Sequence, residues 1–287
     1  MPESVFSAFS AFSAFSFYLI LLLLCHFIGD YYLQTNKMAQ MKESNIQYTI
    51  LHSILYAVPF AVLLLGLMFL KLFSLPAAGI IIAAVILHAV VDLSKCVFEK
   101  SKSAEFENSA HFKRNIYAAD QILHLFVIVI ASFLLSEITV SNLIVSNLAV
   151  SNMTASNTAV FDGISPELYV FLKYLLFIII IAKPINISFK KIFEKYQPTQ
   201  TTDKNCVDPD SVSGAGATIG TLERLLAGIF IGIGQFAAIG LVLTAKSIVR
   251  YDQISKCKPF AEYFLIGTLY SILATLIVYY VIFDFLA

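Results

Sequence analysis

Four of the five histidines in this 287-residue chain lie in apolar segments, and three of them have an aspartate four residues away. The pairs occur in the segments HFIGD, HAVVD and DQILH, and the fourth histidine stands alone in LHSIL. Residues at i and i+4 share one helix face about 6 Å apart, so each pair points at one spot. Ionisable residues at the centre of a membrane helix cost about 2.5–3.5 kcal/mol each, which makes them candidates for function. The seven are His26, Asp30, His52, His88, Asp92, Asp120 and His124.

The order of histidine and aspartate follows the expected direction of each helix. HxxxD closes the first and third apolar segments, whereas His52 and DxxxH open the second and fourth. Because consecutive membrane helices run antiparallel, all seven groups should meet at one membrane face, with each histidine deeper than its aspartate. We therefore predict one His/Asp cluster built by four helices at the cytoplasmic face.

Four imidazoles and three carboxylates form a ligand set that suits a divalent transition metal, zinc first, with manganese or iron as alternatives. Seven groups exceed the four that tetrahedral zinc needs, so two arrangements stay open. One is a dinuclear site with ions about 3.5–4 Å apart. The other holds one ion, and the aspartates orient the imidazole N–H groups. Asp30, Asp92 and Asp120 are also the catalytic candidates, because an aspartate that does not bind the metal can act as a general base.

The composition indicates which elements must position these residues. Apolar residues make up 59% of the chain and charged residues 13%, against about 45–50% and 25% in soluble domains. Only helices carry such apolar runs through lipid, since the backbone must satisfy its own hydrogen bonds there. The sequence therefore predicts an all-α, polytopic transmembrane helical bundle of about seven spans, near residues 17–30, 48–70, 77–94, 117–136, 168–187, 219–244 and 262–283.

Changes in composition divide the chain into four parts. Ser-Asn pairs recur at 141, 146, 151 and 156, and residues 196–218 are polar and contain proline and glycine. A G-x-x-x-G motif at 228–232 permits close helix contact, within the chain or in an oligomer. The expected parts are a four-helix membrane domain with the His/Asp cluster (1–136), a low-complexity loop and fifth helix (137–195), a polar linker (196–218) and a C-terminal glycine-rich helix pair (219–287).

The charges indicate partners and orientation. The formal net charge is zero, so we expect no nucleic-acid partner, and membrane lipids as the surroundings. With the N-terminus outside, eleven Lys and Arg residues fall in cytoplasmic loops and five on the other side, which fits the positive-inside rule. Four of those five lie within 246–258. Either the sixth segment does not fully cross, or 245–261 lies in the interface.

The segments HFIGDYYLQT, LHSIL, HAVVDLSK and DQILHL resemble the signature blocks of a bacterial integral membrane protein family, domain of unknown function 3307. The resemblance covers roughly residues 19–135 and implies a bacterial inner-membrane protein, without naming a reaction. The His/Asp arrangement is also similar to that of inner-membrane metal-dependent hydrolases related to zinc phospholipases. Gln34 and Gln121 belong to the same blocks and can orient the site. The chain lacks the HExxH motif of zinc proteases, which argues against peptide hydrolysis.

Three functions remain open from the sequence. The first is a metal-dependent hydrolase that acts on a lipid or lipid-linked substrate, with metal-bound water as the nucleophile. The second is a cation or proton transporter, although the outer halves of the first four segments are almost wholly apolar. The third is a non-catalytic membrane scaffold with a structural metal, whose coordination shell would be closed.

Overall fold

The computed structural model describes residues 3–42, 45–101, 110–149, 165–198 and 214–286. These residues form helices and turns, and no strand occurs among them. Seven of the helices are long and apolar enough to cross a membrane. The predicted all-α bundle of about seven spans is therefore confirmed.

The chain forms two compact units, residues 1–176 and residues 177–285. The domain boundaries predicted from composition are not tested by this division and stay predictions. The first unit contains α1 (Glu3–Phe27), the π-helix η1 (Ile28–Tyr32), α2 (Asn36–Met41), α3 (Ile46–Phe69), α4 (Leu75–Lys100), α6 (Ala110–Ala149) and the first part of α7 (Pro166–Ala182).

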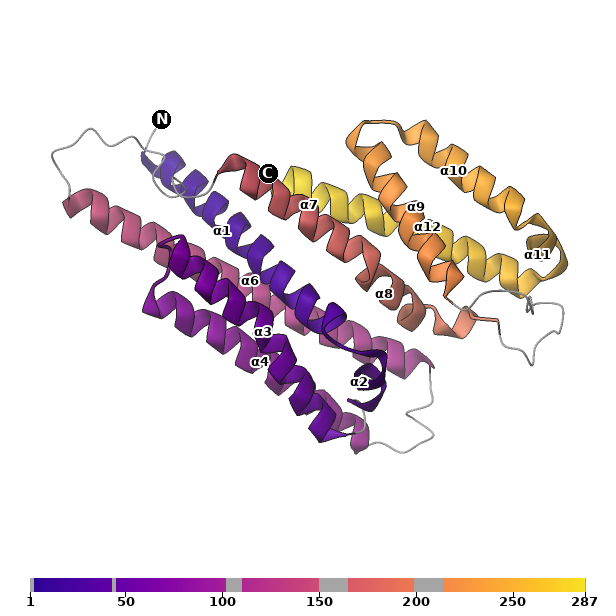
Figure 1. The fold of residues 1–287 in the computed structure, drawn as a ribbon, viewed down its shortest axis with the longest axis horizontal. Coiled ribbons are helices and arrows are strands. Elements are labelled where there is room, and N and C mark those ends of the chain that lie inside the picture. The colour runs from indigo at the N-terminus through magenta and orange to yellow at the C-terminus, as the bar shows by residue number, and fades with distance from the viewer. Residues whose placement is uncertain (1–2, 43–44, 102–109, 150–164, 199–213, 287) are drawn as a thin grey trace. The chain divides into compact units, whose positions relative to one another are not determined.

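Four long helices build the first unit (Figure 1). Helix α1 packs against α3 and α6, and α4 packs against the same two helices, so the four surround a common interior. The apolar side chains on the outer faces of α3 and α6 are strongly exposed, as Ile54 and Ile122 illustrate at 61% and 66%. A broad exposed apolar surface of this kind is what lipid contact requires. The polar side chains of the unit can then gather only inside the bundle.

Local sequence signals set the starts of these helices. The side chains of Thr35, Asn45 and Ser74 each accept a hydrogen bond from a backbone N–H in the first turn of α2, α3 and α4. Such capping satisfies backbone donors that have no partner within the helix. Pro76 adds a residue whose fixed φ suits the first turn. The caps of α3 and α4 set the first residue of each helix, and so the number of turns between the helix start and its histidine.

The end of α1 departs from regular α-helical geometry. Residues Ile28–Tyr32 form a π-helix, which contains Asp30 of the predicted cluster. π-turns are rare and occur often at functional sites. The extra residue in this turn changes the direction in which Asp30 points, relative to a continuous α-helix after His26.

The segment predicted to be a loop from about residue 140 is partly helical, which corrects that prediction. Helix α6 continues to Ala149, so the Ser-Asn pairs at 141 and 146 lie in its last turns, whereas those at 151 and 156 lie outside the described residues. No glycine or proline interrupts residues 110–149. The hydroxyl of Ser141 donates to the Glu137 carbonyl one turn earlier, which keeps a short polar side chain compatible with the helix.

The second unit is also helical. It contains, in chain order, the end of α7, α8 (Pro184–Ile192), the 3₁₀ turn η2 (Glu194–Tyr196), α9 (Ala215–Gly232), α10 (Phe236–Val249), α11 (Tyr251–Lys256), α12 (Lys258–Tyr280) and the π-helix η4 (Val281–Phe285).

The apolar segment expected at 219–244 is not one helix but a hairpin of α9 and α10. Gly234 has a φ of +71°, and the Gln235 N–H donates to the Phe230 carbonyl at 2.7 Å, which closes the turn. Glycine adopts positive φ without steric cost, so the chain reverses here despite its apolar character. The 2.7 Å ion pair between Lys246 of α10 and Glu223 of α9 holds the two arms together.

The G-x-x-x-G motif packs inside the second unit. A Cβ atom at Gly228 would lie 2.6 Å from the Phe177 ring, and one at Gly232 would lie 3.5 Å from the Tyr279 hydroxyl. Gly228 therefore allows close approach between helices of this chain, whereas a Cβ atom at Gly232 would make an ordinary contact. An oligomer contact through the glycine-rich helix stays a prediction.

Candidate metal centre

The four helices of the first unit bring all seven predicted residues into one buried cluster. None of the seven is more than 7% exposed. They come from the last turn of α1 (His26), η1 (Asp30), α3 (His52), α4 (His88 and Asp92) and α6 (Asp120 and His124).

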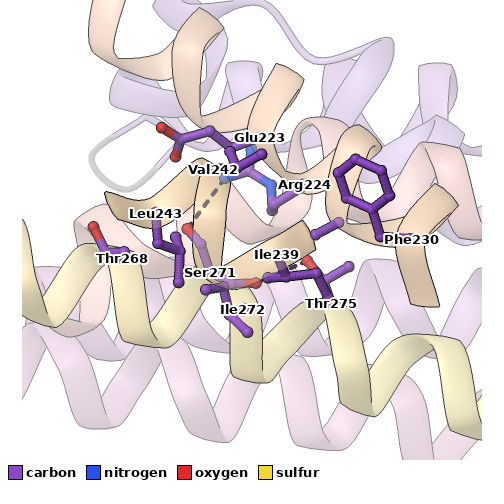
Figure 2. Close-up of a pocket in the computed structure, with 11 residues that line it drawn as sticks. Glu223, Arg224, Phe230, Ile239, Val242, Leu243, Thr268, Ser271, Ile272 and Thr275 are labelled. Carbon is purple, nitrogen blue, oxygen red and sulfur yellow. Dashed lines mark hydrogen bonds between the residues drawn. The ribbon is translucent and has the colours of Figure 1, made fainter. Parts of the chain in front are cut away.

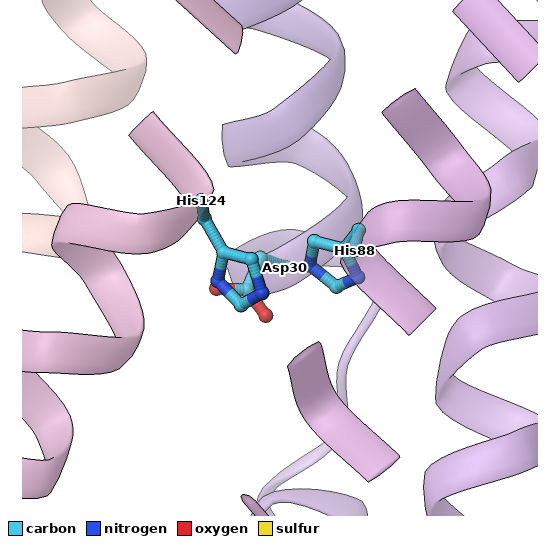
Figure 3. Close-up of side chains that lie close together, drawn as sticks. All are labelled: Asp30, His88 and His124. Carbon is cyan, nitrogen blue, oxygen red and sulfur yellow. The ribbon is translucent and has the colours of Figure 1, made fainter. Parts of the chain in front are cut away.

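Six of the seven residues offer ligand atoms close enough for a metal ion. Three overlapping sets each have their ligand atoms within 4.8 Å of one another: Asp30, His88 and His124; His52, His88 and Asp92; and Asp92, Asp120 and His124. Figure 3 shows the first set, with both imidazoles close to the Asp30 carboxylate. The buried cluster can therefore hold a metal ion.

His26 differs from the other six. No such set among the described residues includes it. Its Nδ1 lies 3.1 Å from the Tyr56 hydroxyl, in hydrogen-bond contact, and its ring centroid lies 5.8 Å from that of His124. The structure thus places His26 in the cluster, next to a tyrosine rather than within a ligand set.

The cluster contains many buried polar atoms without a hydrogen bond. Across the part of the chain that the structure describes, eleven side-chain nitrogen and oxygen atoms of these seven residues have none. His52 Nε2 lies 3.2 Å from Asp30 Oδ1 and 3.3 Å from Asp92 Oδ2, within the distance of an ion pair. A buried polar atom left without a partner costs about 1–3 kcal/mol. Nitrogen and oxygen atoms that converge in this way are the donor set expected around a divalent cation.

Ring stacking holds the central histidine in place. The His88 ring lies between the Tyr56 ring, with centroids 3.5 Å apart and planes at 15°, and the His124 ring, at 4.1 Å and 16°. Tyr56 in turn contacts His26 through its hydroxyl. A metal ligand whose ring is fixed by its neighbours loses little freedom when it binds. Tyr56 therefore positions two of the predicted histidines.

Two lysines lie against the carboxylates. Lys42 Nζ lies 3.5 Å from Asp30 Oδ1 and 3.7 Å from Asp92 Oδ2, and Lys95 Nζ lies 3.3 Å from Asp120 Oδ2. Burial lowers the pKa of Lys42, but the negative charges of Asp30, Asp92 and Asp120 raise it by more, so its pKa stands above the usual lysine value. The ammonium group of Lys42 is therefore charged. With neutral imidazoles, three carboxylates and two ammonium groups leave the cluster with one negative charge.

Two glutamines from the same sequence blocks contact the cluster. Gln121 Nε2 donates to Asp30 Oδ2 and to Asp120 Oδ2, both at 3.4 Å, and its Oε1 accepts from the Tyr31 hydroxyl at 2.8 Å. When the side-chain amide of Gln34 is turned by 180°, its nitrogen donates to the Asp30 carbonyl at 2.8 Å and its oxygen accepts from the Ala39 N–H. Gln121 therefore holds two carboxylates by side-chain contact, and Gln34 holds the backbone beside one of them.

A small pocket reaches the cluster from its outer side. Its walls are Lys42, Thr49, Asp92, Lys95, Cys96 and Glu99. Asp92 thus faces both the pocket and the ligand sets. The volume of this pocket, about 10 Å³, is enough for one water molecule beside Asp92.

Gly29 allows the close contact between η1 and α3, and its substitution should disturb the cluster. A Cβ atom at Gly29 would lie 2.7 Å from Cδ2 and 3.3 Å from Cα of Tyr56, which is held by His88 and His26. We expect Gly29→Ala to destabilise the protein by about 1–3 kcal/mol, as overpacking does. Thermal unfolding of the purified protein measures this, together with metal content, which should also fall.

Gly66→Ala is the matched control, because a Cβ atom at Gly66 meets nothing within 4 Å. Equal melting temperatures and metal contents for the two variants would contradict the role of Gly29.

Sequence reasoning missed Tyr56, Lys42 and Lys95 as members of the site. Tyr56 follows His52 by four residues, so it repeats the spacing of the His/Asp pairs and could have been found. Lys95 follows Asp92 by three residues on the same helix face. Lys42 lies in a connection between helices, where spacing carries no such signal.

A comparison with protein-family models found a match, over residues 18–153, to the family described as "Protein of unknown function (DUF3307)". Comparisons with curated proteins and with solved structures found no match. The matched residues include all seven members of the cluster, and the similarity to metal-dependent hydrolases has no support from these comparisons. Residues 18–153, the part of the chain that carries the candidate metal centre, therefore match the model of the DUF3307 family.

Proposed function

We propose that this chain is an integral protein of the bacterial inner membrane that binds a divalent transition-metal ion, zinc, and hydrolyses a lipid or lipid-linked substrate. The observation that carries the proposal is the convergence on one spot of buried nitrogen and oxygen atoms from four helices, eleven of which make no hydrogen bond with the described residues. A bound zinc ion lowers the pKa of its water ligand to about 7, which supplies a nucleophile.

The charge of the cluster favours one ion over two. The three carboxylates of the cluster, Glu99 on the wall of the adjoining pocket and the two lysines sum to two negative charges, so one divalent ion gives a net charge of zero. A second ion would raise the net charge to plus two at a site that is nearly closed to solvent. Such a charge is costly inside a protein or a membrane. The mononuclear arrangement is therefore the better supported of the two.

Two observations bear on catalysis. The pocket beside Asp92, with a volume of about 10 Å³, has room for one water molecule next to a candidate general base, which supports hydrolysis. The deep burial of all seven residues favours the alternative, a scaffold with a structural metal and a closed shell. The two functions differ in whether a coordination position remains open to solvent.

The experiment is elemental analysis of the full-length protein purified in detergent, followed by cobalt substitution. We expect about one transition-metal ion per chain, and visible cobalt bands that shift when azide is added. Hydrolysis of phospholipid by the same preparation should stop on chelation and return with zinc. Negligible metal in the purified protein would overturn the proposal. One bound ion without an azide response and without hydrolysis would support the scaffold instead.

A further inference from the structure

The second unit contains a small cavity between α9, α10 and α12 that is unrelated to the His/Asp cluster. Its walls carry Glu223, Arg224, Thr268, Ser271 and Thr275 among apolar side chains (Figure 2). The volume of about 10 Å³ is of the order that one water molecule needs. A ligand of this size is monatomic or nearly so, which excludes phosphate and sulfate.

Arg224 is the central polar group of this cavity. It is 2% exposed within a helix that is apolar enough to span a membrane. Its Nε donates to the Ile181 carbonyl, and its Nη2 donates to the Ala182 carbonyl at 3.3 Å and to Thr221 Oγ1 at 3.1 Å. These bonds satisfy carbonyls at the end of α7, just before Pro184 begins α8. One side of the guanidinium therefore has a structural role.

The other side of Arg224 faces the cavity with hydrogen-bonding capacity to spare. Nη1 makes one long contact, 3.4 Å to Ser271 Oγ, which Figure 2 shows as a dashed line. A guanidinium group has five N–H donors, and four are accounted for, so one on Nη1 has no acceptor among the described residues. The Ser271 hydroxyl accepts from Arg224 and donates to none of those residues. Two free donor hydrogens are thus available at one cavity.

The local charge indicates the sign of the ligand. Glu223 and Lys246 form a 2.7 Å ion pair and neutralise each other, and Lys246 also donates to Thr268. Arg224 then leaves one positive charge, which the carbonyl end of α7 offsets by roughly half. An uncompensated positive charge in this position is costly, and a small anion would remove that cost.

The geometry points to a binding site for a monatomic anion between Nη1 of Arg224 and the hydroxyl of Ser271. In aqueous solution the expected anion is chloride. The hydroxyls of Thr268 and Thr275 donate to backbone carbonyls of their own helix, so they add polarity without competing for the ion. A cation is disfavoured, because the guanidinium would repel it.

Two measurements on the full-length protein test this site. Chloride should raise the melting temperature above that in gluconate at equal ionic strength. Bromide, which is located by its anomalous scattering, should appear between Arg224 and Ser271 in crystals. Ser271→Ala removes one donor to an ion and should weaken chloride binding by about tenfold or more.

Ser247→Ala is the matched control, since Ser247 is exposed on α10 and donates to the Leu243 carbonyl. Equal stability in chloride and gluconate, with no bromide in the cavity, would overturn the site. Unchanged chloride affinity in Ser271→Ala would also overturn the assigned ligand atoms. Loss of the metal cluster by Asp92→Asn should leave chloride binding intact, which separates this site from the first.

Discussion

The Asp92→Asn variant should lose its bound metal, with an affinity at least about 100-fold below that of the wild type. Asp92 belongs to two of the three ligand sets and also faces the pocket. Substituting a residue that only supports a ligand typically costs 10–100-fold in metal affinity, so removing a charged ligand should cost at least the upper end of that range. Competition with a chelating indicator, at fixed pH, measures the affinity.

The stability of the metal-free protein separates ligand loss from misfolding. Asn keeps the shape of Asp92 but removes one of three neighbouring negative charges, so the metal-free variant should be at least as stable as the metal-free wild type. Asp252→Asn is the matched control, because that side chain is 85% exposed on α11. Metal affinity within threefold of wild type in Asp92→Asn would remove this residue from the site.

The sequence was sufficient to predict which residues converge, because the argument needs only helix periodicity and antiparallel order. A His/Asp pair at i and i+4 shares one face of a regular helix, and the three paired faces and the face of His52 have one interior to share. The π-turn at Ile28–Tyr32 was not predictable in the same way. This turn contains Gly29, which packs closely on Tyr56 of another helix, and such a contact between helices cannot be read from spacing along the chain.

The hairpin in the second unit illustrates a different limit. Hydropathy merges α9 and α10 into one segment, because the turn at Gly232–Gln235 is itself mostly apolar. In the sequence, the four basic residues within 246–258 were the available sign that this apolar segment is not a single crossing. Since α10 returns toward the start of α9, Lys246 comes to lie beside Glu223, and the basic segment follows at that end of the unit.

Lys42→Gln should have opposite effects on the metal-free protein and on metal affinity. In the metal-free protein, the ammonium group lies between Asp30 and Asp92 and offsets their repulsion. Its removal should therefore lower the melting temperature. In the metal-bound protein, the same charge repels the ion and competes for the same oxygens. Two charges about 4–5 Å apart interact by several kcal/mol at an effective dielectric constant of about 20, so the variant should bind the metal at least about tenfold more tightly.

The opposite signs distinguish this expectation from simple damage, which would reduce both quantities. Lys37→Gln is the matched control, since Lys37 is exposed on α2 and makes none of these ion pairs. Melting curves with and without a chelator give the two stabilities, and indicator competition gives the affinity. Lower metal affinity in Lys42→Gln would mean that the lysine holds the carboxylates in position for the ion. The net charge of the cluster would then no longer favour one metal ion over two, because Lys42 would support metal binding rather than compete with the ion for the carboxylates.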